Sequence, residues 1–244
     1  MESDFKASLA EFIGTFTLVF IGAGAGALAI VGNGGILGVA LAHGTALMVI
    51  IYAFGSISGA HVNPAVTLGV ALAGRMTWAR AVFYWAAQFL GAALAAYVLL
   101  WILEPGQLSG GETVGAYTTP AAVDKDAHAI ARVLAVEAIL TFFLVVAVFA
   151  SGVQGRNGNL AGVAIGAVLT MDILAGGPLT GASMNPARTF GPALAVGNFS
   201  YLWMYLVGPM LGGAVGALMY DRLFLPARLQ PPVEAADDAH RIRR

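Results

Sequence analysis

Long apolar segments separated by short polar ones run along almost the whole chain. A helix needs about 20 mostly apolar residues to cross the hydrocarbon core of a bilayer. Six segments meet this requirement, at roughly residues 8–31, 36–57, 80–103, 130–151, 159–177 and 201–224. The pattern therefore predicts an all-α membrane protein with six transmembrane helices.

Two further apolar segments are much shorter. They cover residues 64–73 and 186–196, and they begin at the Asn-Pro pairs Asn63-Pro64 and Asn185-Pro186. Proline suits the first turn of a helix because an N–H group there has no helical partner. We predict two re-entrant half-helices that enter the membrane without crossing it. Short, interrupted segments at matching places in two halves of a chain point to a transport site.

Composition agrees with a chain that lipid surrounds. Hydrophobic residues make up 59% of the 244 residues and charged residues only 10%, whereas a soluble domain carries about 25% charged residues. The 32 glycines would let helix backbones approach closely in a membrane bundle. A net charge of −1 gives no reason to expect a nucleic-acid partner. The absence of cysteine excludes disulfides and thiol catalysis.

Lysine and arginine set the expected orientation. Nine of the twelve fall on the side of the six-span arrangement that holds both chain ends: Lys6, Arg75, Arg80, Arg156, Arg222, Arg228, Arg241, Arg243 and Arg244. By the positive-inside rule both termini are expected in the cytoplasm. The connection 104–129 is then external, and the polar segment 226–244 is predicted to be a disordered cytoplasmic tail. Short termini and richness in Ala, Gly and Val suggest a bacterial inner membrane.

The two halves of the chain resemble each other in sequence. Residues 11–19 match residues 137–145 at an offset of 126, and residues 58–65 match residues 180–187 at an offset of 122. Each half holds three spans, so the second half enters the membrane from the opposite face and the repeat is inverted. The half-helices then dip in from opposite faces, and their N-termini meet near the midplane.

This arrangement predicts a single channel domain over residues 1–225, with one repeat at about 8–118 and the other at about 128–225. A helix N-terminus carries roughly half a positive charge and unpaired N–H groups. Two such ends facing one lumen oppose cations. Asn63 and Asn185 each offer a side-chain NH₂ to passing water there.

The residues just before each Asn-Pro pair are expected to be extended chain at membrane depth. Irregular backbone is tolerated there only where it lines a wet cavity. The candidate pore-lining carbonyls belong to Gly59, Ala60, His61, Gly181, Ala182 and Ser183. Loop amides need acceptors, and we expect Glu11 and Glu137 to provide them. In the alternative interpretation these carboxylates carry protons in a coupled transporter.

The segments SGAHVNPAVT (58–67) and TGASMNPARTFGPAL (180–194) resemble the two signature boxes of aquaporins, the major intrinsic protein family. With the six spans and a repeated Glu-x-x-x-Thr, the resemblance covers residues 8–224. It implies the aquaporin fold, a passive pore in each subunit of a homotetramer, and no cofactor or metal. The motif positions it assigns are Asn63, Pro64, Ala65, Asn185, Pro186 and Ala187.

The resemblance also implies an outer constriction, or selectivity filter, formed by His43, Ile173, Ala182 and Arg188. Strict water channels usually have an aromatic residue at the first of these positions and His at the second. The set found here is similar to that of some plant vacuolar-membrane aquaporins, a group linked with ammonia, urea and peroxide passage. Glycerol facilitators typically have Asp where this chain has Thr189, so that alternative loses weight.

The sequence therefore predicts a channel for water and small neutral solutes. A glycerol and urea facilitator is the alternative, and a proton-coupled secondary transporter is a remote one. A membrane enzyme is disfavoured because no nucleophile–base pair, metal cluster or cofactor motif is found. His128 is expected to be exposed in the external connection. Asp172 is expected near the external end of its span, where it would cap or pair locally.

Overall fold

The computed structural model describes residues 2–29, 34–155 and 157–226. Over these ranges every regular element is helical. The tail predicted over residues 226–244 lies outside the described residues from 227 onward, as does Arg156.

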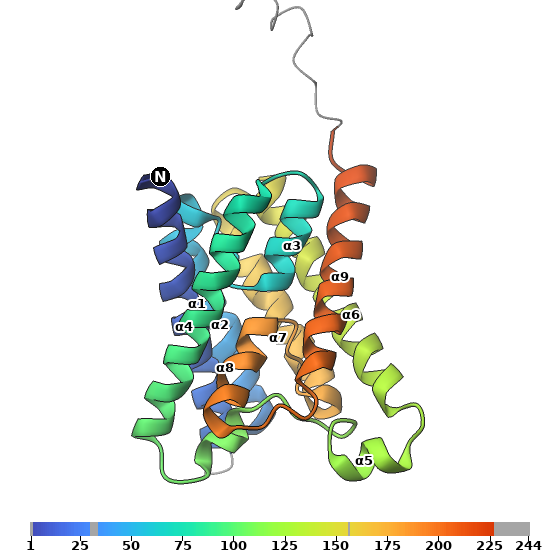
Figure 1. The fold of residues 1–244 in the computed structure, drawn as a ribbon. Helices are drawn as coiled ribbons and strands as arrows, with labels where there is room; N and C mark the ends of the chain where they lie inside the picture. Colours follow the sequence, from blue (N-terminus) through green and yellow to red (C-terminus); the bar gives the residue numbers. More distant parts are fainter. Residues whose placement is uncertain (1, 30–33, 156, 227–244) are drawn as a thin grey trace, which may run out of the picture.

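Six helices in the described part of the chain are long and apolar enough to cross a membrane. They are α1 (Glu2–Ala29), α2 (Gly35–Ser58), α4 (Trp78–Ile102), α6 (Ala129–Val148, continued by a π-helical turn, Phe149–Val153), α7 (Ala161–Thr180) and α9 (Leu202–Leu223). The prediction of an all-α protein with six spans is confirmed. Figure 1 shows these helices standing side by side around the two shorter ones.

Two helix ends differ from the sequence prediction. Helix α1 begins at Glu2, before the predicted span, because its first turns are helical although their residues are polar. Helix α7 runs to Thr180, through Pro178, where the prediction ended at residue 177. Proline in the last turn removes only one helical hydrogen bond, and neighbouring helices compensate for that loss.

The half-helices are α3 (Pro64–Leu72) and α8 (Pro186–Val196). Each starts at its proline and is capped by the preceding asparagine. Asn63 Oδ1 accepts the N–H of Ala65, and Asn185 Oδ1 accepts the N–H of Ala187. Figure 1 shows α3 in the half of the molecule that carries the N-terminus and α8 in the opposite half. The order α1, α2, α3, α4 is thus repeated as α6, α7, α8, α9.

Glycines set how closely the helices approach. A Cβ atom added to Gly44 of α2 would lie 2.5 Å from the carbonyl oxygen of Gly166 in α7. Gly91 of α4 would meet the carbonyl of Phe12 at 2.4 Å, and Gly212 of α9 would meet that of Ala138 at 2.0 Å. These are distances that a side chain cannot occupy, so the three backbone crossings depend on glycine.

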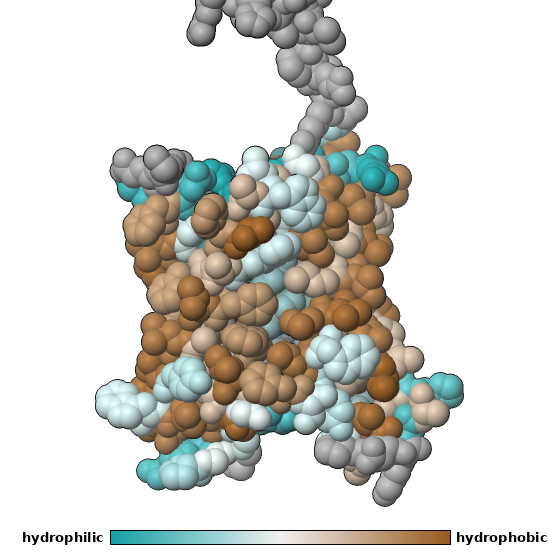
Figure 2. All heavy atoms as spheres, in the orientation of Figure 1, coloured by the Kyte–Doolittle hydropathy of each residue, from teal (hydrophilic) through white to brown (hydrophobic). Residues whose placement is uncertain are grey.

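The outer surface of the bundle is apolar. Figure 2 shows a broad hydrophobic belt between two more polar ends. Many large apolar side chains of the long helices are exposed, among them Trp101 at 85%, Leu90 at 64% and Phe83 at 61%. Such a belt is stable against lipid chains and not against water. The polar connections at the two ends include three short elements that the sequence did not indicate: η1 (Gln107–Gly111), α5 (Pro120–Lys125) and η3 (Gly158–Leu160).

Candidate pore and outer constriction

The two loops that lead into the half-helices share an unusual backbone. Each leaves its long helix through a left-handed glycine, Gly59 at φ 88° and Gly181 at φ 86°. Four residues with side chains follow in the same region: Ala60, Val62, Ala182 and Met184, at φ between 42° and 54°. Each costs about 1–2 kcal/mol in this conformation, so the loops need strong support from their surroundings.

Glu11 of α1 supports the first loop. Its carboxylate accepts the backbone N–H of His61 at 2.9 Å and that of Val62 at 2.6 Å. Ser58 Oγ and Gln88 Nε2 donate to the same carboxylate. The side chain is fully buried, so it acts as a fixed acceptor for a loop that has no helical partners.

Glu137 of α6 holds the second loop in the same way. It accepts the N–H of Ser183 at 3.0 Å, the N–H of Met184 at 2.8 Å and the hydroxyl of Thr180 at 2.7 Å. It too is fully buried. The two carboxylates therefore occupy equivalent places in the two halves.

The two Asn-Pro corners are bonded to each other across the centre of the protein. Asn63 Nδ2 donates to the carbonyl of Met184 at 2.8 Å, and Asn185 Nδ2 donates to the carbonyl of Val62 at 2.8 Å. An amide NH₂ carries two hydrogens. These bonds use one from each asparagine, which leaves the other available to a molecule in the lumen.

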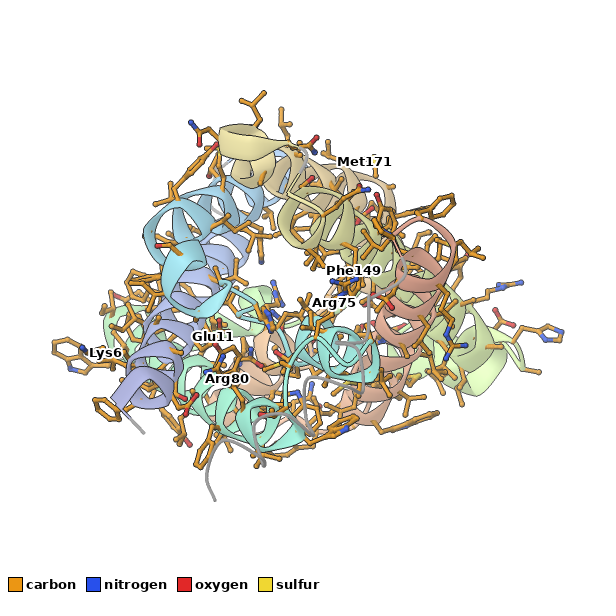
Figure 3. All side chains as sticks on the ribbon, turned by 90° about the horizontal axis from the view of Figure 1, so that it is seen from above. Lys6, Glu11, Arg75, Arg80, Phe149 and Met171 are labelled. Atoms are coloured by element: carbon orange, nitrogen blue, oxygen red, sulfur yellow. The ribbon has the colours of Figure 1, made fainter. Side chains whose placement is uncertain are left out.

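A cavity of about 610 Å³ passes these corners. It extends from Arg75 and the π-helical turn, at the end nearer the N-terminus, to His43 and Arg188. Figure 3 looks into the bundle from this end, with Arg75 and Phe149 labelled. Eight of the predicted site residues line the cavity: His43, Gly59, Ala60, His61, Asn63, Ser183, Asn185 and Arg188. Ile173, Gly181 and Ala182 are not among its lining residues, and Ile173 and Ala182 are each only 3% exposed.

Arg188 closes the far end of the cavity. Its Nε donates to His43 Nε2 at 3.2 Å. Its Nη1 donates to the carbonyl of Gly111 at 3.2 Å and to Thr113 Oγ1 at 2.6 Å. His43 Nδ1 lies 2.9 Å from the carbonyl of Val39, which can only accept. The imidazole proton is therefore on Nδ1, and Nε2 accepts from the guanidinium as a neutral ring.

A family model described as major intrinsic protein matches residues 1–220. The chain belongs to this family. It is 39% identical over 242 residues to aquaporin TIP2-1 of Arabidopsis thaliana, covering 95% of this chain and 92% of that protein. It is 42% identical over 221 residues to aquaporin NIP1-4 of Oryza sativa subsp. japonica, covering 89% and 76%. The sequence-based assignment to the family is confirmed, and the chain is an integral membrane protein.

A solved structure supports the same fold. The aquaglyceroporin from Plasmodium falciparum superimposes with a TM-score of 0.75 at 25% identity, covering 91% of this chain and 98% of that one. The predicted aquaporin-like fold is thereby confirmed for this major intrinsic protein. Among the residues that the structure describes, no group of three or more His, Asp or Glu side chains is placed to hold a metal ion.

Sequence reasoning missed several residues that contact Arg188 or His43 in this major intrinsic protein. Gly111 and Thr113 belong to the connection 104–129, whose irregular sequence gives no signal for contact with Arg188. Gly22 of α1 lies against His43, and a Cβ atom there would come within 2.3 Å of His43 Nε2. The high glycine content of the chain indicated close helix packing, but it did not indicate which side chain Gly22 faces.

The expectation for Asp172 is wrong. It lies eight residues before the end of α7, only 1% exposed, and its Oδ2 has no hydrogen-bond partner. Because α7 continues past the predicted boundary, Asp172 is in the body of the helix rather than near its end. A third buried acid therefore accompanies Glu11 and Glu137. His128 is exposed in the connection 104–129, and its expected exposure is thus confirmed.

Proposed function

We propose that this protein is a passive channel for water and small neutral solutes such as ammonia, urea or hydrogen peroxide, and that it excludes protons and ions. The observation that carries the proposal is the cavity that reaches both Asn63 and Asn185. A water molecule there would use both lone pairs of its oxygen to accept from the two amides. It could still donate to its neighbours but could not accept a hydrogen bond from them, so a proton could not be relayed through it. Aquaporin-type pores are the known example of this selectivity, in which positive half-helix ends oppose protons and cations.

The proposed solute range rests on the constriction. His43 and Arg188 are hydrogen-bonded to each other, and Ile173 stands where strict water channels have histidine. Ile173 does not itself line the cavity, so what it contributes to the proposal is the absence of a polar side chain on that side of the constriction. This absence suits ammonia or urea better than a ring of polar side chains does. A glycerol and urea facilitator is the alternative. The likeness to a structure named as an aquaglyceroporin points to it, but the relatives named above are aquaporins, so the alternative is not favoured.

Proton-coupled transport is the remote alternative. The Glu11 carboxylate accepts two backbone N–H groups and that of Glu137 accepts two as well. A carboxylate that must release these bonds to take up a proton is a poor carrier. We propose no enzymatic activity, since the similar proteins carry channel names.

We propose a homotetramer with one pore per subunit and with both termini in the cytoplasm. Both half-helices come from one chain, so a subunit contains a whole pore, and the excess of Lys and Arg on one side supports the orientation. The plant relatives do not support the bacterial inner membrane that composition suggested. Crosslinking of the purified protein tests the tetramer, and protease access to the tail in sealed vesicles tests the orientation.

Stopped-flow permeability of proteoliposomes tests the channel. Water, ammonia, urea and glycerol are compared with empty vesicles, and the double variant H43F/I173H is run alongside. We expect fast water flux, and ammonia or urea passage that the double variant abolishes. Water flux without solute passage would refute the argument that His43 and Ile173 let ammonia or urea through the constriction. Glycerol flux would favour the glycerol and urea facilitator. Absence of water flux from folded protein would refute the channel.

A further inference from the structure

Three hydroxyl groups lie in a row behind the outer constriction, between Arg188 and the second Asn-Pro corner. Arg188 Nη1 donates to Thr113 Oγ1 at 2.6 Å, and Thr113 Oγ1 lies 3.0 Å from Thr189 Oγ1. Thr189 Oγ1 contacts Ser183 Oγ, which donates to the carbonyl of Asn185 at 2.9 Å. The three hydroxyl side chains are at most 5% exposed. We call them the hydroxyl row.

The hydrogens of the hydroxyl row can be assigned by counting. Three hydroxyls supply three protons, and three contacts each need one: Thr113 to Thr189, Thr189 to Ser183, and Ser183 to the Asn185 carbonyl. A carbonyl only accepts, so the Ser183 proton is committed to it. Thr189 must then donate to Ser183, and Thr113 must donate to Thr189. Every donor in the row points away from the guanidinium.

All hydroxyls of the row donate in the same direction, away from Arg188, and this arrangement suits a cation at the start of the row. The oxygen of Thr113 accepts from Arg188 while its proton is given onward, so each bond polarises the next and strengthens it. The final acceptor, the Asn185 carbonyl, also accepts the N–H of Thr189 at 3.2 Å. The position of the guanidinium is thereby linked to the asparagine that caps α8.

The external connection holds Thr113 in place from both sides. Before it, η1 packs so closely on α1 that a Cβ atom on Gly111 would lie 2.5 Å from the carbonyl of Ala23. After it, the N–H groups of Ala116 and Tyr117 donate to the carbonyls of Pro178 and Leu179 at the end of α7, each at 3.0 Å. Thr113 is therefore brought to Arg188 by a docked segment.

The first half of the protein has the same threonine without the same partners. Thr67 is the equivalent of Thr189 at the offset of 122. Its Oγ1 accepts from Gln88 Nε2 at 3.0 Å and contacts His61 Nδ1 at 3.1 Å. The residue before it is Val66, where the second half has Arg188. Only the second half connects its threonine to a guanidinium.

We propose that Thr113, Thr189 and Ser183 are positioning residues that act through Arg188. The hydroxyl row holds the guanidinium at one point of the constriction, and this fixed position sets the ratio of solute to water passage. The inference rests on the proposed channel function. A guanidinium without this anchor shifts to admit a larger solute, so discrimination falls although the charge is unchanged.

The test is the urea-to-water permeability ratio of proteoliposomes. Thr189→Val keeps the shape of the side chain and removes the hydroxyl, and we expect the ratio to rise about 3- to 10-fold, the factor that corresponds to one hydrogen bond. Thr189→Ser restores the hydroxyl and should restore the wild-type ratio. Thr67→Val is the comparison variant, because this buried threonine of the other half bonds to Gln88 and His61 and not to Arg188. It should lower water flux through a weakened first loop, but it should not raise the ratio.

Thr113→Val and Ser183→Ala remove the other two hydroxyls of the hydroxyl row. They also provide the test if Thr189→Val does not assemble. Because the residues act in one row, the double variant T113V/T189V should show no more effect than either single variant. A wild-type ratio in all three hydroxyl-free variants overturns the proposal, and so does an equal rise in Thr67→Val. Wild-type protein that conducts no water refutes the channel itself, a result distinct from either of these.

Discussion

Replacing Glu137 with glutamine tests how the second pore loop is stabilised. Glutamine retains one oxygen, which can still accept from Thr180 and Ser183. Its NH₂ replaces the oxygen that accepts the Met184 N–H at 2.8 Å, so two donors face each other in a fully buried place. A hydrogen bond to a charged group contributes about 1.5–3 kcal/mol, and a stranded donor costs about 1–3 kcal/mol.

We therefore expect the free energy of unfolding to fall by about 2–4 kcal/mol, which lowers the unfolding temperature by about 5–15 °C in a chain of this size. Water permeability should fall several-fold as well, because the residue after Met184 is Asn185, whose amide faces the lumen. Thermal unfolding in detergent and stopped-flow shrinkage of proteoliposomes measure the two effects. Glu104→Gln, at an exposed position, is the matched control.

The equivalent variant Glu11→Gln should behave in the same way, since its carboxylate accepts Val62 N–H at 2.6 Å and Gln88 Nε2 at 2.8 Å through the same oxygen. Unfolding temperature and water flux indistinguishable from wild type in both variants would refute the support role. Flux that becomes insensitive to a proton gradient only in these variants would instead favour coupled transport.

Three other changes have expected outcomes. Gly22→Ala places a Cβ atom within 2.3 Å of His43 Nε2, so it should move the imidazole away from Arg188 and lower water flux without loss of assembly; unchanged flux would contradict this. Asp172→Leu removes a buried oxygen that has no partner and should raise the free energy of unfolding by about 1–3 kcal/mol; a lower unfolding temperature would show that the carboxylate has an unrecognised partner. Burial raises the pKa of the Glu112 carboxyl, against the opposing hydrogen bond from Asn198, so the folded state holds this proton more tightly. Stability should then fall as the pH rises above 4.5, the ordinary pKa, and Glu112→Gln should abolish that step.

Most of the fold could be predicted because the signals for it are long or repeated. A span of twenty apolar residues and two Asn-Pro pairs in register with a repeat are hard to produce by chance. The helix ends were harder, since the first turns of α1 are polar and α7 passes through Pro178. Both are stabilised by tertiary contacts that local composition does not encode, which is also why Asp172 was placed too near a helix end.

The candidate site also has a part that could be predicted from the sequence and a part that could not. Asn63, Asn185 and the two glutamates belong to repeated motifs, and the structure brings each pair to equivalent positions. The partners of Arg188 do not repeat. Thr113 arrives from a connection that has no counterpart in the other half and no periodic pattern, so only the packing of η1 on α1 and of residues 115–117 on α7 reveals it.

In our proposal, the selectivity of this protein depends on the positions at which its two halves differ. The inverted repeat supplies a symmetric scaffold: two half-helices, two buried glutamates, two loops with the same left-handed residues. A pore built from these alone would present the same chemistry to both faces.

The symmetry is broken where Val66 becomes Arg188 and His61 becomes Ser183, with Thr67 and Thr189 unchanged beside them. In the first half the threonine bonds to Gln88, next to the supporting Glu11; in the second it bonds toward Arg188 through Thr113. The same residue thus stabilises the loop in one half and, in our proposal, anchors the constriction in the other, so the solute range should respond to Thr189 and not to Thr67.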